Sequence, residues 1–224
     1  MAVSPKKDSG FVLKDCALIA IATGQRAITL KEFRDLLATI TSGSIDYHFW
    51  GGMLQPRFEE REFNNDFASW ARHSLHDGIL AERLAMIDPA DYQNMEPLRL
   101  ELLEQVEQRL DESEYLHWAH ALYPFEFIHA KIVVFDTHHR LKAPRRLASM
   151  LPRMSTSSVF YHFIDARRRL GGKDDFRQWL ESFGDSYLPL CAELAAIDPS
   201  FAPLTELRQQ LAETFSRHFK GARS

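Results

Sequence analysis

The strongest constraint on the fold is a block that the chain contains twice, with Tyr-His-Phe beginning at Tyr47 and again at Tyr161. The two tyrosines are 114 positions apart, and a shift by that number aligns residues 11–49 with residues 125–163 without a gap. Three further blocks follow in the same order in both segments: "NNDFASW" and "KDDFRQW", "ERLAMIDP" and "AELAAIDP", "EPLRLELLEQV" and "APLTELRQQLA". Four matched blocks predict a tandem duplication, and repeats of this kind determine the architecture of a chain.

The matched blocks also define where the copies begin and end. We expect copy one at residues 11–110, a joint at residues 111–124 and copy two at residues 125–219. We expect the copies to pack together as one pseudosymmetric globule, because a short β-hairpin is only marginally stable alone.

Each copy begins with an apolar run that ends in turn residues, "LIAIATGQRAIT" in the first and "KIVVFDTHHRLKA" in the second. Aromatic and β-branched residues favour strands, and Thr-Gly or Asp-Thr-His-His favours a turn, so each run predicts a short β-hairpin. Helical spacing follows, and the first helix has a capping box at Thr29 and Glu32. The predicted fold is therefore mainly α (α+β with short β-hairpins), a pseudo-two-fold duplication of a hairpin plus about four helices.

The composition is that of an ordinary globular protein, with 45% hydrophobic and 26% charged residues. A formal net charge of −4 predicts no nucleic-acid partner, because nucleic-acid-binding domains usually carry a basic surface. Cys16 and Cys191 lie far apart in apolar runs, which predicts two reduced thiols. There is no signal-peptide pattern, and the apolar run at residues 16–22 is too short to cross a bilayer. We therefore expect a cytoplasmic protein that does not bind membranes.

The paired Tyr-His motifs are the candidate functional site, since a histidine can transfer protons or hold a ligand. With nearby arginines they form this candidate ligand or interface set: Tyr47, His48, Arg57, Tyr161, His162 and Arg167. The competing interpretation is a histidine at the border of a packed helix face, hydrogen-bonded to a backbone carbonyl in the other copy. His162 could pair with Asp165, but Gly51 occupies the aligned position in copy one, which favours packing. Arg169 is four residues from Asp165 and can pair with it.

Four other matched residues have structural interpretations. Asp66 and Asp175 lie in a first helical turn, where a carboxylate meets the positive end of the helix dipole. Trp70 and Trp179 recur with phenylalanines at helical spacing, which indicates core positions more than a sugar-stacking platform. The spacing of the histidines and cysteines predicts no metal site, and no phosphate-binding loop or nucleophile motif occurs. We therefore predict no metal and no cofactor.

The blocks "VVFDT", "SSVFYHFIDARRRLG", "DDFRQWL" and "LAAIDP", with "YHFWGGMLQPRF" and "NNDFASWARHSLHD", resemble an uncharacterised bacterial family, a domain of unknown function. The resemblance runs from about Phe11 to Phe215 and implies no activity, cofactor or catalytic residue. The family pattern is Asn-Asp-Phe, whereas copy two has Asp174 at the first position. Aspartate keeps the ability to cap a helix, so only a specific amide contact is in doubt.

The sequence predicts a non-catalytic cytoplasmic binding or adaptor protein that holds a protein or small-molecule ligand in the groove between its copies. The reason is a capped helical scaffold without an assembled catalytic motif. The alternative is an enzyme or small-ligand-binding accessory protein, for example in carbohydrate metabolism, that uses the paired Tyr-His motifs and nearby arginines. The partner and the oligomeric state are left open.

Overall fold

The computed structural model describes residues 10–54, 62–92, 94–200 and 202–221. The fold is mainly α, as predicted. Two long strands, β1 (Phe11–Thr29) and β2 (His120–Leu141), pair in one antiparallel two-stranded sheet. The chain divides into two compact units. Unit 1 contains residues 1–17 and 133–224, and unit 2 contains residues 18–132.

The prediction of a short β-hairpin in each copy was wrong, because β1 and β2 continue through the predicted turns. Gly24 and His138, at the centres of those turns, have φ values of +76° and +61°. A positive φ inside a paired strand bends it, as at a G1 β-bulge, and does not reverse its direction. The hydroxyls of Thr23 and Thr137 each donate a 2.6 Å hydrogen bond to a carbonyl of the other strand. The turn residues therefore produce bends.

The predicted pseudo-two-fold duplication is not what the structure shows either. A hairpin-plus-helices copy would be one continuous segment, whereas unit 1 combines N-terminal residues with the C-terminal half of the chain. The two Tyr-His-Phe blocks also differ locally. One lies in the α-helix α2 (Ser42–Trp50), and the other lies in the π-helical segment η5 (Phe160–Asp165). The copy boundaries rest on motif order in the sequence and stay a prediction.

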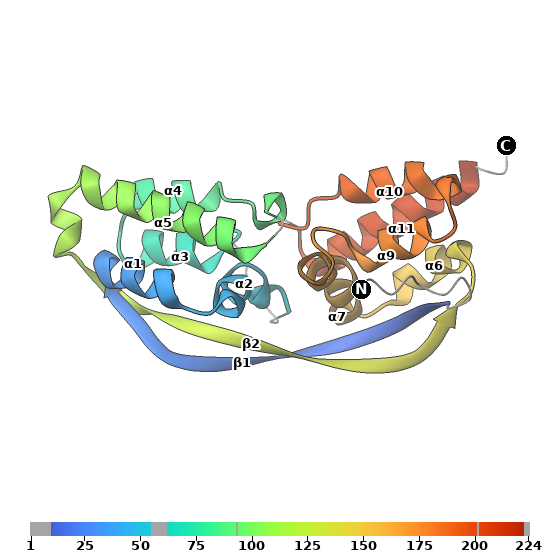
Figure 1. The fold of residues 1–224 in the computed structure, drawn as a ribbon, viewed down its shortest axis with the longest axis horizontal. Helices are drawn as coiled ribbons and strands as arrows, with labels where there is room; N and C mark the ends of the chain where they lie inside the picture. Colours follow the sequence, from blue (N-terminus) through green and yellow to red (C-terminus); the bar gives the residue numbers. More distant parts are fainter. Residues whose placement is uncertain (1–9, 55–61, 93, 201, 222–224) are drawn as a thin grey trace, which may run out of the picture. The chain divides into compact units, whose positions relative to one another are not determined.

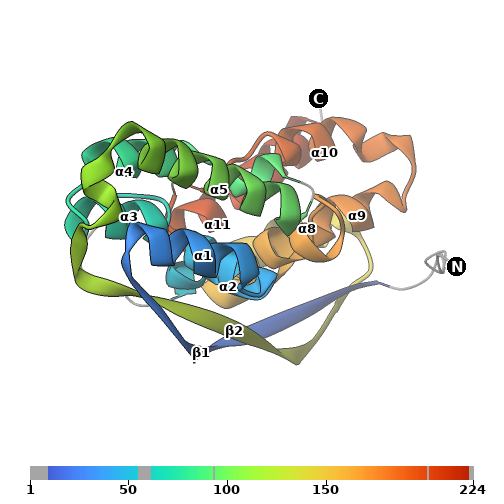
Figure 2. The ribbon, with the colours of Figure 1, turned by 60° about the vertical axis from the view of Figure 1, so that its left-hand side comes forward.

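Unit 2 packs its helices on one side of the paired strands (Figures 1 and 2). Thr29 and Glu32 form the predicted capping box at the first helix. The long helix α5 packs against α1, α2 and α4. The elements of unit 2 outside the sheet are α1 (Leu30–Thr39), α2, η1 (Gly51–Leu54), α3 (Asp66–His73), α4 (Gly78–Ala85), η2 (Pro89–Asp91), α5 (Met95–Glu112) and η3 (Glu114–His117).

An aromatic cluster forms the centre of unit 2. Phe33 of α1 is fully buried and contacts Phe67 and Trp70 of α3 and Phe125 and Phe127 of β2. Each such side chain contributes about 1.5–3 kcal/mol through burial. The strand is therefore held to the helices mainly by its inward-facing phenylalanines.

Unit 1 is built in a similar way from shorter elements. Phe11 of β1 packs on Phe176, and Phe176 contacts Phe163 and Phe215. Helix α11 packs against α6, α7 and α10. The helical elements of unit 1 are α6 (Pro144–Met150), η4 (Leu151–Arg153), α7 (Thr156–Val159), η5, α8 (Ala166–Arg169), α9 (Asp175–Glu181), η6 (Asp185–Tyr187), α10 (Leu188–Ala195) and α11 (Leu204–Gly221).

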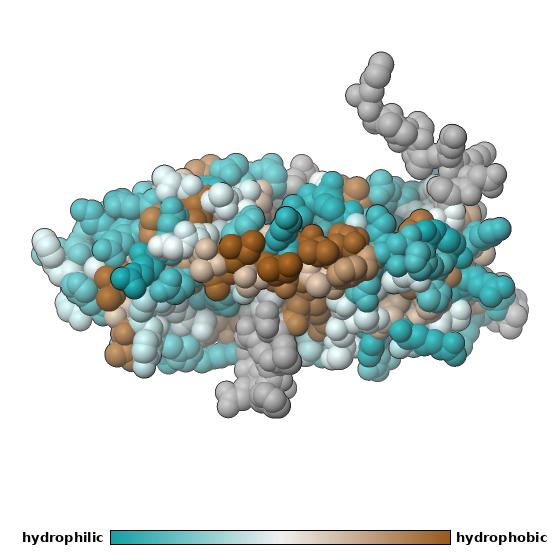
Figure 3. Space-filling view, turned by 90° about the horizontal axis from the view of Figure 1, so that it is seen from below, coloured by the Kyte–Doolittle hydropathy of each residue, from teal (hydrophilic) through white to brown (hydrophobic). Residues whose placement is uncertain are grey.

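The sheet keeps apolar side chains at the surface. Figure 3 shows such side chains gathered on the face along which β1 and β2 run. In unit 2, all of residues 19–22 of β1 are exposed although the stretch is Ile-Ala-Ile-Ala. None of the described helices is both long enough and apolar enough to cross a lipid bilayer.

The bend at Gly24 is testable by substitution. Gly24→Ala should lower the free energy of unfolding by about 1 kcal/mol, because a Cβ disfavours positive φ. No atom lies within 4 Å of the added Cβ, so the loss reports backbone conformation alone. His138→Ala is the matched control and should change the free energy by less than about 0.5 kcal/mol, since His138 already has a Cβ at positive φ. Urea denaturation measures both, and equal effects would argue against the bend.

Candidate functional site

His48 of unit 2 is hydrogen-bonded at both ring nitrogens. Its Nδ1 lies 3.1 Å from Oδ2 of Asp66, and its Nε2 accepts a 3.1 Å hydrogen bond from the backbone N–H of Ile128. Only an unprotonated ring nitrogen accepts a hydrogen bond, so the proton of the neutral ring is on Nδ1 and is donated to Asp66. The residue is 2% exposed. His48 therefore joins helix α2 to the first turn of α3 and to strand β2.

His162 of unit 1 has the same arrangement. Its Nδ1 lies 2.7 Å from Oδ2 of Asp175, and its Nε2 accepts a 2.9 Å hydrogen bond from the backbone N–H of Lys14. The ring is buried beside Phe11 and Phe176. Each histidine thus bonds to a residue of the other predicted copy, but its partner there is a backbone amide and not the carbonyl that we expected.

This geometry limits what the two histidines can do chemically. A carboxylate on one ring nitrogen is the arrangement that orients a general base. A general base also needs its second nitrogen open to the proton that it removes, and in both units a strand amide occupies that nitrogen. The arrangement favours the packing interpretation over proton transfer.

The two tyrosines lie beside these histidines and are also buried. Tyr47 meets the ring of His48 edge-on, with 5.3 Å between ring centroids. A Cβ on Gly51 would lie 2.2 Å from the ring of Tyr47, which explains the glycine at this position. Tyr161 lies 4.3 Å from the guanidinium of Arg169 and 5.8 Å from the ammonium of Lys14. Two cations therefore stabilise the Tyr161 ring by cation–π interactions.

Beside His162, two arginines and two carboxylates of unit 1 form a network of ion pairs. Arg169 donates to Asp175 at 3.1 Å and forms the expected ion pair with Asp165 at 2.7 Å. Arg168 donates to the other oxygen of Asp165 at 2.8 Å. Burial opposes ionisation of Asp175, but the hydrogen bond from His162 and the charge of Arg169 together hold its pKa below the ordinary value. Asp175 is therefore an ionised anchor for His162.

The two arginines of the predicted set differ in what the structure describes of them. Arg57 lies outside the described residues. Arg167 places its guanidinium 4.4 Å from the ring centroid of Phe163 and donates to the carbonyl of Ile197 at 3.1 Å. Arg169 contacts Tyr161 instead, and the signal that could have found it was its four-residue spacing from Asp165.

The residues predicted to be structural lie at helix starts and in the cores. Asp66 and Asp175 are in first turns, directly after the caps Asn65 and Asp174. Trp70 is buried and donates from Nε1 to the carbonyl of Tyr123 at 2.9 Å. Trp179 is half-buried and packs on Phe11 and Phe183.

Asn65 and Asp174 cap their helices with the same hydrogen bond, but their other contacts differ. Oδ1 of each accepts a 2.8 Å hydrogen bond from the amide three residues later. Asn65 also donates from Nδ2 to the carbonyl of Leu84 at 2.9 Å, a contact that an aspartate cannot make. Asp174 pairs with Arg177 instead. Burial raises the pKa of Asp174 although Arg177 opposes the shift.

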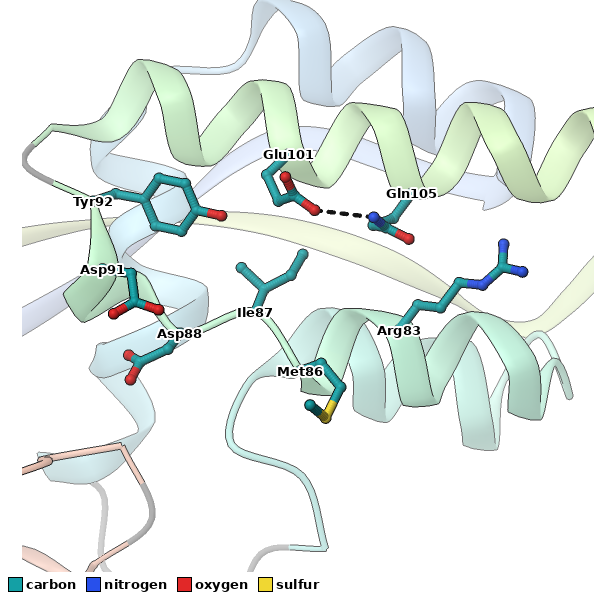
Figure 4. A pocket seen from close by; sticks show the side chains of 8 residues that line it. All are labelled: Arg83, Met86, Ile87, Asp88, Asp91, Tyr92, Glu101 and Gln105. Atoms are coloured by element: carbon teal, nitrogen blue, oxygen red, sulfur yellow. Dashed lines mark hydrogen bonds between the residues drawn. The ribbon is translucent and has the colours of Figure 1, made fainter.

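A cleft of about 250 Å³ lies in unit 2 between the end of α4, η2 and α5 (Figure 4). Burial, and then the charges of Glu101, Asp91 and Asp88, raise the pKa of Tyr92 in this cleft. Sequence reasoning missed it, because the Ile-Asp-Pro block was interpreted only as a helix stop. The cleft is lined by Arg83, Met86, Ile87, Asp88, Asp91, Tyr92, Glu101 and Gln105.

Neither the acidic side chains nor the thiols of the described residues suggest a metal centre. Within the described ranges there is no group of three or more His, Cys, Asp or Glu side chains that could hold a metal ion. Cys16 and Cys191 are both free and buried. Burial, followed by the charges of Asp15 and Asp165, raises the pKa of Cys16 to about 12, so this thiol stays protonated.

Comparisons with known proteins identify the fold and the family of the chain. The chain is similar to the solved structure described as "The structure of OrfY from Thermoproteus tenax", with a TM-score of 0.84 and 24% sequence identity. The match covers 95% of this chain and 98% of that chain, and at this identity it shows the fold alone. The chain belongs to the family of unknown function DUF5752, whose model matches residues 8–216. No curated protein matches the chain.

The histidine contacts predict a large stability effect. His48→Ala should lower the free energy of unfolding by about 2–4 kcal/mol, because it leaves a cavity and removes one hydrogen bond to Asp66 and one from the Ile128 amide. His120→Ala, an exposed histidine of the same unit, is the control and should change it by less than about 0.5 kcal/mol. Thermal and urea unfolding measure both. A His48→Ala protein of unchanged stability would contradict the packing role.

Asp174 and Asp175 predict opposite pH dependences at adjacent positions. The raised pKa of Asp174 makes its contribution to stability largest at low pH, and that contribution is lost as the pH rises through its folded pKa. The lowered pKa of Asp175 adds stability above the unfolded pKa, which is lost as the pH falls. From about pH 3 to 6, Asp174→Asn should therefore gain stability relative to the wild type as the pH rises, and Asp175→Asn should lose it. Unfolding free energies over this range measure both slopes, and slopes of the same sign would contradict the assignment.

Proposed function

We propose that the chain is a non-catalytic binding protein that holds an extended segment of a partner protein on strand β1 of unit 2. The observation that carries the proposal is the exposed apolar stretch at residues 19–22. Ile19 is 49% exposed and Ile21 is 44% exposed, and both alanines between and after them are exposed as well. Successive residues of a strand point to opposite faces, so apolar side chains face solvent on both sides of β1 here.

The edge of β1 is also open for pairing. In the described part of the chain β1 has β2 as its only neighbouring strand, so the backbone groups along its other edge are not part of a ladder. Natural edge strands are protected by charged residues, above all Lys, or by Pro. The sequence from Cys16 to Thr23 contains none of these. An edge of this composition invites an added strand, in which main-chain hydrogen bonds give affinity and alternate side chains give specificity.

The non-catalytic part of the proposal is supported by the state of the reactive groups. An enzyme built on the Tyr-His motifs would need an imidazole nitrogen free to accept a proton, and strand amides occupy that position on His48 and His162. Burial raises the pKa of both Cys16 and Cys191, which keeps these thiols in their less nucleophilic form. A binding role needs none of these groups. The predicted groove between the copies stays a prediction.

Peptides selected from a display library against the wild-type protein test this site. The selected peptides should bind at least about tenfold more weakly to Ile19→Lys/Ile21→Lys, since two ammonium groups would lie in the apolar contact. Ile79→Lys is the matched control, because Ile79 is 50% exposed on α4 of the same unit and its variant should bind normally. Isothermal titration calorimetry gives the affinities, and hydrogen exchange should show new protection at residues 18–22.

Peptides that bind the double variant and the wild type equally would overturn the proposed site. Substrate turnover that His162→Gln abolishes in a folded protein would favour the enzyme alternative instead.

A further inference from the structure

The near-neutral charge of the chain hides two oppositely charged units. Unit 1 has 17 basic and 12 acidic side chains, a formal charge of +5. Unit 2 has 10 basic and 19 acidic side chains, a formal charge of −9. Charge asymmetry of this size creates surface potentials that attract partners of opposite sign.

The positive charge of unit 1 is concentrated in one segment. Residues 137–164 contain no acidic residue. Four exposed cations of this segment form what we call the basic patch: Lys142, Arg145, Arg146 and Arg153. They lie on consecutive short pieces of chain from the end of β2 through α6 to η4, and α6 and η4 pack on each other. Across the described ranges none of the four has an ion pair, whereas Arg140 just before them is paired with Asp136.

Unit 2 contains a cleft that is lined by acidic side chains and could hold a cationic side chain. The cleft between α4, η2 and α5 has carboxylates from Asp91 and Glu101, and its apolar wall comes from Ile87 and Met86 (Figure 4). Glu101 accepts a hydrogen bond from the neutral Gln105 at 2.9 Å, so its charge is not compensated by that contact. We call this site the acidic cleft.

Among the described residues that line the acidic cleft, Arg83 is the one cation, and it already has an ion pair. Arg83 donates to Glu112 at 2.8 Å, and Glu112 is not part of the lining. The lining carboxylates of Asp91 and Glu101 are therefore left to attract a further cation.

An arginine side chain matches this cleft in each of its parts. Its guanidinium donates two parallel hydrogen bonds to a carboxylate and stacks on an aromatic face, here that of Tyr92. Its aliphatic stem packs on apolar surface, here that of the 83% exposed Met86. The basic patch of unit 1 presents such side chains in Arg145 and Arg146.

We propose that the protein self-associates head to tail, with the basic patch of one copy docked on the acidic cleft of a second copy. The two surfaces are different, so the contact is heterologous and continues into rings or open chains of copies. A second copy is favoured over a nucleic acid, because the charge of −9 on unit 2 repels a long polyanion and attracts the basic patch. This inference does not depend on the proposed binding of a partner strand.

Association of this kind should be weak and sensitive to salt. Exposed ion pairs contribute little individually and are screened over about 8 Å at physiological ionic strength. Sedimentation velocity of the full chain should therefore show concentration-dependent growth at about 0.02 M salt and monomers at about 0.5 M salt.

Two neutralised variants test the contact directly. Arg145→Gln/Arg146→Gln keeps the acidic cleft and loses the basic patch, and Asp91→Asn/Glu101→Gln keeps the patch and loses the cleft. Each variant alone should remain monomeric at low salt. Mixed together, they should form a 1:1 dimer that grows no further, because only one complementary pair of surfaces remains. Arg217→Gln/Lys220→Gln, the same loss of charge near the end of α11, should associate like the wild type.

Three results would overturn the proposal. The first is a wild-type protein that is monomeric at all concentrations at low salt. The second is association that persists in both neutralised variants. The third is a monomeric protein whose basic patch binds an oligonucleotide or a polyglutamate peptide, which would assign the patch to another class of partner.

Discussion

In each unit a buried imidazole joins a strand to a helix, beside the phenylalanines that hold that strand to the core. His48 holds the amide of Ile128 and the carboxylate of Asp66, and His162 does the same in unit 1. A two-stranded sheet is only marginally stable alone, so such contacts and the inward-facing phenylalanines keep the strands on the helices. The same hydrogen bonds occupy the nitrogens that proton transfer would use. In both histidines the two ring nitrogens therefore make structural hydrogen bonds, one to a carboxylate and one to a strand amide.

The anchored strands leave much of their length in solvent. Gly24 and His138 bend β1 and β2 where a turn was expected, so each strand continues and no hairpin closes. In unit 2 the helices cover one side of the sheet, and the apolar run around Ile19 and Ile21 remains exposed. Exposed apolar edge strands are normally avoided because they invite pairing. The exposed edge of β1 is the observation that supports the proposed binding role.

The net charge of each unit says more about its surface than the net charge of the whole chain does. The formal charge of −4 argues against polyanion binding only if the charges are mixed, and the units instead carry +5 and −9. The basic patch and the acidic cleft are local consequences of that separation. The patch lies around Arg145 and the cleft around Asp91. Hydrophobic periodicity predicts helices and core positions, and it predicts no binding surface in either segment.

The sequence by itself determined the local features, because caps, helix starts and helical periodicity depend on residues a few positions apart. The Thr29 capping box, the Asp165–Arg169 pair and the mainly helical fold were all readable from it. Only the tertiary structure decided which strand pairs with which, because a positive φ serves a turn and a bend equally well. It also decided the partner of each imidazole, since Lys14 and His162 are 148 positions apart and no local spacing relates them. The chemistry of His162 was thus set by a contact that exists only once the chain is folded.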